Sequence, residues 1–154
     1  MSKHSEWLTE CEKKGFSPSP RTYEEGTRTA EDAATQLGCK VSSIAKSIVF
    51  TGKECAIIIV TSGSNKVDRK KKLKKILGYK PKQASPEYVL ENTGFEIGGI
   101  PPFGHLEKCI IFCDEDLMKH DIVWGAGGTS KVVFPISPEE LVRISGATIV
   151  DIKQ

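Results

Sequence analysis

A lysine in a β-prone segment is the first residue whose chemistry stands out. Residues 44–51 are rich in Val, Ile and Phe, which favours a β-strand. Side chains alternate between the two faces of a strand, so Lys46 shares its face with Ile48 and Phe50. A lysine on an apolar face must either reach solvent or contact an anion. Two interpretations stand side by side: a strand-end lysine that reaches solvent, and a cation at the floor of a pocket, ready for a carbonyl oxygen or a phosphate.

A glycine- and proline-rich run over residues 94–105 is the second candidate. Its glycines permit positive φ and close backbone approach, while two adjacent prolines fix φ and keep the preceding residue extended. We expect a stiff loop whose free N–H groups face a ligand, because a preorganised donor aimed at an oxyanion is worth ~10²–10³ in rate. The alternative is a loop that only turns a corner, beside a histidine that is either a base or a hydrogen-bonded structural residue. The candidate substrate-binding residues here are Gly98, Gly99, Ile100, Pro101, Pro102 and His105.

A second glycine cluster over residues 124–131 contains Gly125, Gly127, Gly128 and Ser130. It lacks the spacing of a phosphate-binding P-loop and is too short for a dinucleotide fingerprint, so we expect no nucleotide cofactor. We expect no cofactor of another kind either. Without four spaced Cys or His ligands, a structural metal site is not expected either. A wall where the backbone approaches a small substrate and a plain hairpin turn remain equal alternatives.

A cluster of basic residues follows the first two predicted strands. Residues 66–82 hold nine Lys or Arg against one Asp, a local charge of +8 in a chain of net charge +2, so the remainder sums to −6. The spacing predicts a helix over 66–77 that ends at Gly78 and buries Leu73, Ile76 and Leu77. Such a run is usually a solvated helix face, but its one-sided field also suits RNA phosphates. The candidate phosphate-contacting residues are Lys66, Arg69, Lys71, Lys72 and Lys75.

Length and composition are those of a globular domain. The chain has 154 residues, of which 38% are hydrophobic and 27% charged, so one core is expected. No stretch approaches the ~20 apolar residues of a membrane span, and residues 1–6 lack the apolar segment of a secretory signal. The five cysteines include no C-x-x-C pair, which indicates reduced thiols that pack as small hydrophobes. We therefore expect a cytoplasmic protein.

The elements that must position these residues alternate irregularly. We expect strands over 44–51, 55–61, 109–113 and 147–152, a glycine-rich turn with one further strand between 123 and 135, and helices over 5–14, 30–37, 66–77, from 86 onward and over 138–145. Because strands outnumber clean β-α-β alternations, the predicted fold class is α+β, with a curved, barrel-like mixed sheet surrounded by helices. Residues 1–20 are expected to form an N-terminal arm with a short helix and a linker, and residues 21–154 a single domain.

In their order and spacing these segments resemble the YbaK family, the trans-acting aminoacyl-tRNA deacylases that are similar to the editing insert of bacterial prolyl-tRNA synthetases. The resemblance runs from about residue 29 to 152, most of the chain, and residues 1–20 lie outside it. The matching segments are Ala45-Lys46-Ser47, Lys66-Val67-Asp68, the loop 94–105, Asp114, the turn Gly125-Ala126-Gly127-Gly128 and the helix start Ser137-Pro138-Glu139-Glu140-Leu141.

This resemblance implies hydrolysis of the ester that joins a wrong amino acid to the 3′ adenosine of a tRNA, with Ala- or Cys-tRNA(Pro) as the leading substrates. Lys46 matches the family's essential lysine, and Gly98 to Pro102 match its Gly-x-x-x-Pro loop, which contacts the aminoacyl-adenosine end. An aminoacyl ester is already activated, so a positioned water and a stabilised oxyanion suffice without a protein nucleophile. Lys46 is then expected to anchor the substrate's phosphate or carbonyl, with His105 and Ser130 as secondary candidates.

The implied partners are tRNA, contacted by the basic cluster, and prolyl-tRNA synthetase, whereas neither a membrane nor DNA is expected. A second class of function stays open, a non-catalytic module that uses the same fold to bind tRNA or a synthetase. A third and weaker class is a small-molecule esterase or nucleotide-binding protein, which would turn over a simple aminoacyl ester without RNA.

Overall fold

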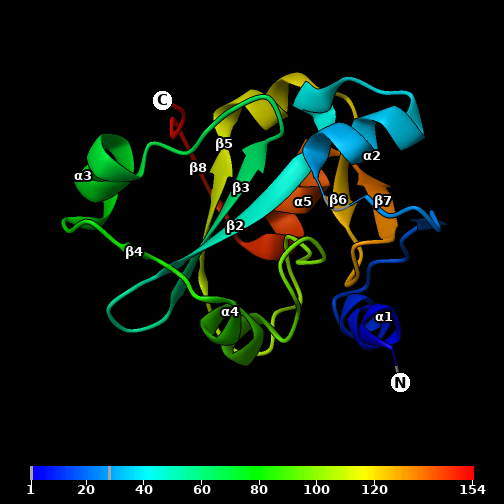
Figure 1. Cartoon of the computed structure of the whole chain (residues 1–154), viewed down its shortest axis with the longest axis horizontal. Helices are drawn as coiled ribbons and strands as arrows, with labels where there is room; N and C mark the ends of the chain where they lie inside the picture. The colour runs from blue at the N-terminus through cyan, green and yellow to red at the C-terminus, as the bar shows by residue number, and fades with distance from the viewer. Residues whose placement is uncertain (1, 28) are drawn as a thin grey trace.

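The computed structural model describes residues 2–27 and 29–154. Their strands form two sheets with helices around them (Figure 1). The strand order is β4-β2-β3-β5-β8 in the five-stranded sheet and β1-β7-β6 in the three-stranded sheet. The strands are β1 (Arg21–Thr22), β2 (Ala45–Thr51), β3 (Ala56–Ser62), β4 (Lys82–Gln83), β5 (Ile110–Asp114), β6 (Val123–Ala126), β7 (Val132–Ile136) and β8 (Thr148–Val150).

The central strand β3 organises the larger sheet. It is buried along its whole length, as its run of Ala, Ile and Val requires for a strand covered on both faces. The antiparallel partner β2 lies on one side of β3, and β5 and β8 follow in parallel on the other. The mixed sheet predicted from the sequence is therefore confirmed.

The two sheets meet at the start of β2, where Ile44 forms a parallel bridge with Trp124 of β6. The short strand β4 pairs with the other end of β2, at Phe50 and Thr51. The strands curve around the core without closing into a barrel, because β4 and β8 remain at the two ends of the five-stranded order.

Capping residues set most helix boundaries. A Ser or Thr hydroxyl accepts a first-turn backbone N–H at the start of α1, α2, α4 and α5, and a glycine with positive φ ends α2, α3, α4 and α5. The sequence predicted these starts and stops within a few residues. The helices are α1 (Lys3–Lys13), α2 (Ala30–Leu37), α3 (Lys74–Leu77), α4 (Pro86–Thr93) and α5 (Pro138–Ser145), with 3-10 turns η1 (Val41–Ser43) and η3 (Glu115–Lys119).

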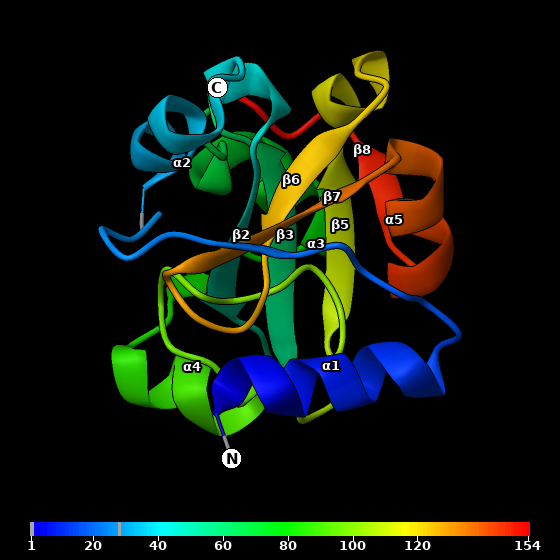
Figure 2. The same cartoon turned by 90° about the vertical axis from the view of Figure 1, so that its right-hand side faces the viewer.

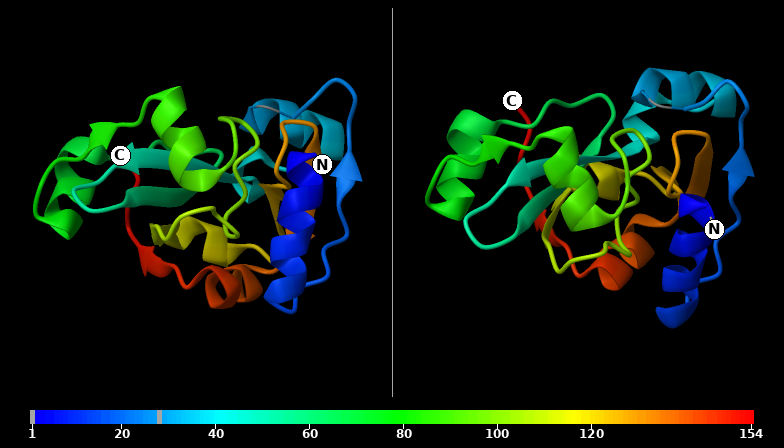
Figure 3. Two further views of the ribbon diagram at one scale, coloured as in Figure 1. Left: turned by 90° about the horizontal axis from the view of Figure 1, so that it is seen from below. Right: turned by 60° about the horizontal axis from the view of Figure 1, so that its bottom comes forward.

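The N-terminal helix α1 belongs to the core. Trp7 and Cys11 are fully buried, and Trp7 Nε1 donates to the Phe103 carbonyl oxygen at 3.1 Å. The Trp7 ring also packs on Phe134 of β7, with 4.5 Å between ring centroids. Figures 2 and 3 show α1 lying across one end of the molecule beside the β6–β7 hairpin. The sequence predicts this helix as part of an N-terminal arm, and in the structure the helix covers apolar surface of the domain, a contact that its amphipathic pattern does not reveal.

The basic segment departs from one regular helix. It begins as a π-helical turn, η2 (Arg69–Leu73), which continues into the single turn α3. Leu73 is fully buried as predicted, whereas Leu77 is only partly buried and Ile76 is exposed. This segment lies at the opposite end of the molecule from α1 (Figure 1). In the described ranges, no helix is long and apolar enough to cross a membrane.

Candidate active site

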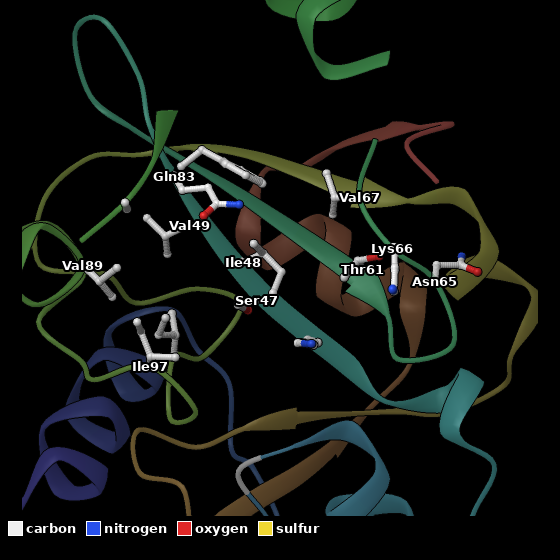
Figure 4. Close-up of a pocket in the computed structure, with 14 residues that line it drawn as sticks. Ser47, Ile48, Val49, Thr61, Asn65, Lys66, Val67, Gln83, Val89 and Ile97 are labelled. Atoms are coloured by element: carbon white, nitrogen blue, oxygen red, sulfur yellow. The ribbon is translucent and has the colours of Figure 1, made fainter. Parts of the chain in front are cut away.

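Two hollows share a wall formed by β2 and the loop before Pro101. The larger has a volume of about 360 Å³ and the smaller, toward α2 and β6, about 100 Å³. Figure 4 shows the larger hollow astride β2, with Ile97 on one side of the strand and Lys66 on the other. Volume alone does not single it out, since a hollow beside α1 has about 390 Å³. The shared wall consists of Lys46, Ser47, Ile48, Ile97 and Ile100.

The hollows exist because part of one edge of β2 has no strand beside it. On that edge β4 pairs only with Phe50 and Thr51, and β6 reaches only Ile44. Between these two pairings, residues 45–49 pair with β3 on the other edge alone. A strand edge normally carries unpaired N–H and C=O groups, so this stretch offers main-chain polar groups to whatever enters.

Lys46 lies on this wall and is exposed. Of the two interpretations of its position, the strand-end lysine that reaches solvent agrees with its exposure, and its place in the lining of both hollows keeps the pocket cation as a prediction. The face of β2 that carries Lys46 is covered at Ile44 and at Phe50, which are both buried, and is open between them at Lys46. The ammonium nevertheless borders both hollows, where it is free to meet an anionic ligand.

The loop before Pro101 is held against the second glycine loop. The Gly128 N–H donates to the Gly99 carbonyl oxygen at 3.1 Å, and a Cβ on Gly99 would stand 2.7 Å from Thr129 Cα. Only glycine permits this approach. Gly98 takes φ +95°, which turns the chain between exposed Ile97 and buried Ile100. The stiff loop predicted from the sequence therefore presents two isoleucines, one on each side of a glycine pair, to the wall of the hollows.

The second glycine loop mainly serves packing. Gly125 borders the smaller hollow, but a Cβ on Gly127 would meet Val132 at 2.8 Å, and one on Gly128 would meet the Lys3 carbonyl oxygen at 2.8 Å. His4 Nδ1 also lies 2.7 Å from the Gly127 carbonyl oxygen, so α1 fixes this loop.

His105 lies in a different place from the hollows on β2. It borders the hollow beside α1, and its Nε2 is 2.7 Å from the Pro101 carbonyl oxygen. Burial lowers the pKa of His105 to about 4. The ring is therefore neutral near pH 7 and braces the loop, which matches the structural alternative considered for it.

The predicted site residues thus divide into those around the shared wall and those behind it. Around it are Lys46, Gly98, Ile100, Gly125 and Lys66. Behind it, lining neither hollow, are Gly99, Pro101, Pro102, His105, Gly127, Gly128 and Ser130. Ser130 contributes its carbonyl oxygen to Thr27, at 3.0 Å from the Thr27 hydroxyl.

A buried carboxylate supports the Lys66 side of the larger hollow. Asp114 is fully buried, and its Oδ2 accepts from the Thr61 hydroxyl at 3.1 Å, the Ser62 N–H at 3.0 Å and Asn65 Nδ2 at 2.8 Å. Both Thr61 and Asn65 line the hollow. Asp114 therefore fixes the turn after β3 from beneath, a role the sequence marked only as part of the family resemblance.

Asn65 also links this carboxylate to a second one. Its Nδ2 donates to Asp116 Oδ2 at 2.9 Å, and Lys153 Nζ lies 2.7 Å from the same oxygen. Lys153, with Lys119 and Asn65, holds the pKa of the Asp116 carboxyl well below its usual range. Sequence reasoning missed Asn65, Thr61 and Ser47. A polar triplet Thr61-Ser62-Gly63 at the end of an apolar strand was the available signal.

The predicted phosphate-contacting residues differ in whether their side chains are engaged within the protein. Lys66 borders the larger hollow, and Lys71 and Lys75 are exposed. Arg69 instead donates to the Pro81 carbonyl oxygen at 3.0 Å, and Lys72 pairs with Asp151 at 2.7 Å. Arg69 and Lys72 are therefore partly engaged within the protein.

Comparison with known proteins identifies the family of this chain. The profile of the aminoacyl-tRNA editing domain matches residues 24–144. The uncharacterized protein YwhH of Bacillus subtilis (strain 168) is 37% identical over 124 residues, covering 80% of this chain and 78% of that protein. The proline–tRNA ligase of Thermosipho melanesiensis is 34% identical over 101 residues, which are 64% of this chain but only 18% of the ligase.

The fold is also that of a solved structure described as a candidate trans-editing enzyme for prolyl tRNA synthetase. The two superpose with a TM-score of 0.94 at 37% identity, over 100% of this chain and 98% of that one. The similarity includes α1, which lies outside the segment that the profile matches. This chain belongs to the aminoacyl-tRNA editing domain family, of the YbaK type found in prolyl-tRNA synthetases.

Proposed function

We propose that this protein is a trans-editing deacylase that removes a wrong amino acid from tRNA, with Ala- and Cys-tRNA(Pro) as the leading substrates. The observation that carries the proposal is the placement of the exposed Lys46 ammonium against the Ile97–Ile100 loop on the shared wall of the two hollows. The family and the similarity to a candidate trans-editing enzyme support the same activity.

The reaction proposed is hydrolysis by water. A water oxygen attacks the ester carbonyl carbon, the bond from that carbon to the 3′ oxygen breaks, and a proton from the water ends on the leaving oxygen. The products are the free amino acid and a tRNA with a free 3′ hydroxyl. Among the described residues, neither hollow is lined by His, Cys, Asp or Glu. This lining supports a mechanism without a protein nucleophile, because a serine needs a neighbouring base to be activated.

Lys46 would anchor the negative charge that the substrate brings. The ester of a 3′ adenosine lies next to a phosphodiester, and an oxyanion develops on the carbonyl oxygen during attack. An exposed ammonium can serve either charge. Lys66, on the other side of the larger hollow, offers a second cation for the phosphate chain.

The apolar residues of the wall would select the amino acid by size. Ile97 is 53% exposed and Ile100 is 5% exposed, so the loop presents one projecting and one sunken apolar side chain. A pocket of this kind distinguishes one methylene by only about 1–3 kcal/mol. Alanine and cysteine are the leading candidates from the family resemblance, and contacts of this strength decide between amino acids of similar size.

The proposed partners follow from the charge distribution and from the relatives. Lys71 and Lys75 would contact tRNA phosphates, and prolyl-tRNA synthetase is the second proposed partner, since the family includes domains of that enzyme. We also propose a cytoplasmic location, which a role in translation supports. The alternative is a module that binds tRNA or the synthetase through the same surfaces and does not hydrolyse the ester.

A deacylation panel tests the proposal. tRNA(Pro) charged in turn with Ala, Cys, Ser and Pro is incubated with the wild type, Lys46→Ala and Lys108→Ala; Lys108 is exposed and lines neither hollow. We expect the wild type and Lys108→Ala to hydrolyse at least one small mischarged ester, and Lys46→Ala to lose ~10³-fold or more while still binding tRNA. Absence of ester hydrolysis across the panel, with tRNA binding intact, would leave the binding module as the function.

A further inference from the structure

The direction of the main-chain groups along β2 follows from one hydrogen bond. The Gly63 N–H donates to the Ile44 carbonyl oxygen at 2.8 Å, which makes Ile44 and Gly63 a hydrogen-bonded pair of the β2–β3 ladder. In an antiparallel ladder such pairs recur at every second residue. The register then gives Lys46–Thr61 and Ile48–Ile59 as the next hydrogen-bonded pairs.

Ser47 therefore turns both its N–H and its C=O away from β3, toward the open edge. It lies midway between the two pairings that occupy this edge, β6 at Ile44 and β4 at Phe50. Ser47 is also part of the wall shared by the two hollows. A donor and an acceptor of one residue thus face the proposed substrate site without a strand to pair with.

The side chain of Ser47 is unpaired as well. Its hydroxyl oxygen is buried and has no hydrogen-bond partner among the described residues. Buried polar groups are nearly always paired, so an unpaired one needs an explanation such as a missing ligand or water. Two independent observations, the strand edge and the hydroxyl, therefore single out the same residue.

We infer that the aminoacyl group pairs with the main chain of Ser47 as one residue of an added strand would. The Ser47 C=O accepts from the substrate's α-ammonium, and the Ser47 N–H donates to the ester carbonyl oxygen. This inference rests on the proposed function. The two residues of a hydrogen-bonded pair in an antiparallel ladder each give one donor and one acceptor to the other. The α-ammonium and the ester carbonyl oxygen of the substrate are such a donor and acceptor, and they match the free C=O and N–H of Ser47. The same N–H then faces the oxygen on which negative charge develops, which makes Ser47 an oxyanion donor.

Charge and length favour an aminoacyl end over a longer peptide. The gap is bounded by β6 on one side and β4 on the other, which leaves space for a very short extended segment. Exposed ammonium groups of Lys46 and Lys66 border the same hollow. A peptide carries no phosphate for these ammonium groups to contact, whereas the ester of an aminoacyl-tRNA lies next to a phosphodiester.

Hydrogen exchange at single amides tests the inference. In the free protein the Ser47 amide should exchange at least about tenfold faster than those of Lys46 and Ile48, which bond to β3. Saturation with 3′-alanylamino-3′-deoxyadenosine, an amide that is not readily hydrolysed, should slow Ser47 at least about tenfold and leave its neighbours unchanged. Binding of the analogue without protection of Ser47 would overturn this inference alone. No binding, together with no deacylation, would overturn the proposed function.

Two substitutions give a second readout. Ser47→Pro removes the edge N–H without touching the ladder to β3, and proline is tolerated at strand edges; Ser47→Ala keeps the N–H. We expect Ser47→Pro to lose about 10²-fold more deacylation than Ser47→Ala, with both variants folded by circular dichroism. Equal rates for the two variants would show that the main-chain N–H has no role. Should Ser47→Pro not fold, the amide exchange experiment decides alone.

Discussion

The two ends of the larger hollow differ in how their polar groups are satisfied. At the Asp114 end, one buried carboxylate accepts four hydrogen bonds, from Thr61, Ser62, Asn65 and the Asp116 N–H. At the Ser47 end, the strand edge has no pairing strand and the hydroxyl has no partner.

This difference separates positioning from binding. A fully paired buried network rigidifies its surroundings, and unpaired groups are tolerated where a ligand completes them. The Asp114 end therefore holds the turn that carries Asn65 and Lys66, and the Ser47 end receives the substrate. The predictions below test whether paired groups in this molecule contribute stability and unpaired groups contribute binding.

The Asp114 network should show the largest effect on stability. Asp114→Asn replaces one acceptor oxygen with an amide that faces existing donors, so we expect a loss of about 2–4 kcal/mol in the free energy of unfolding. The matched control is Asp151→Asn, since Asp151 is an exposed partner of Lys72 and should change stability by about 0.5 kcal/mol or less. Urea unfolding of both variants measures this; similar small losses would mean that the buried carboxylate is not a structural centre.

His105 should make the protein less stable in acid. Its folded pKa of about 4 lies below the ordinary value of 6.5, so the unfolded chain takes up the proton first as the pH falls. The stabilisation is complete above pH 6.5 and is lost as the pH falls toward 4, a decrease on the order of 2–3 kcal/mol. Urea midpoints across this range for the wild type and His105→Gln check it. Parallel pH profiles for the two proteins would contradict a buried neutral ring.

The hydroxyls of two serines, Ser43 and Ser47, should respond to removal in opposite ways. The Ser43 hydroxyl donates to the Lys40 carbonyl oxygen at 2.8 Å, so Ser43→Ala should cost about 1 kcal/mol of stability. The Ser47 hydroxyl has no partner, so Ser47→Ala should leave stability unchanged or raise it. Thermal unfolding of the two variants gives the comparison directly. A larger loss at Ser47 than at Ser43 would show that the Ser47 hydroxyl is paired in the free protein.

In the basic segment, exposed lysines can be compared with a lysine that is paired within the protein. Changing exposed Lys71 and Lys75 together to Gln should reduce the log–log salt slope of tRNA binding by about 1.4–1.8, at roughly 0.7–0.9 per lost phosphate contact. Lys72→Gln should reduce it less, because Lys72 pairs with Asp151. Filter binding across a salt series measures the slopes, and an unchanged slope in the double variant would make the segment a solvated surface only.

Local signals in the sequence predicted most of the elements. The helices predicted to begin at residues 30, 86 and 138 do begin there, with Thr29, Ser85 and Ser137 as their N-caps, because capping depends on neighbours within one turn. The mixed sheet and the position of Lys46 on β2 also follow from local patterns. The stiff loop before Pro101 follows from proline and glycine chemistry.

What could not be predicted depends on distant parts of the chain. The packing of Trp7 under Phe103 joins residues far apart in sequence, and so does the bridge between Ile44 and Trp124 that leaves the edge of β2 open. The exposure of Lys46 depends on which distant elements cover its face of the sheet, and the pattern of its own strand does not show this. For the same reason His105, close in sequence to the loop, lies in another hollow.

The most direct test of the account is the position of a bound substrate analogue. A crystal structure with 3′-alanylamino-3′-deoxyadenosine should place the alanyl group against Ser47, between Lys46 and Ile100, with the ribose at the larger hollow. An alanyl group bound elsewhere, for example in the hollow beside His105, would contradict the assignment of the β2 edge as the active site.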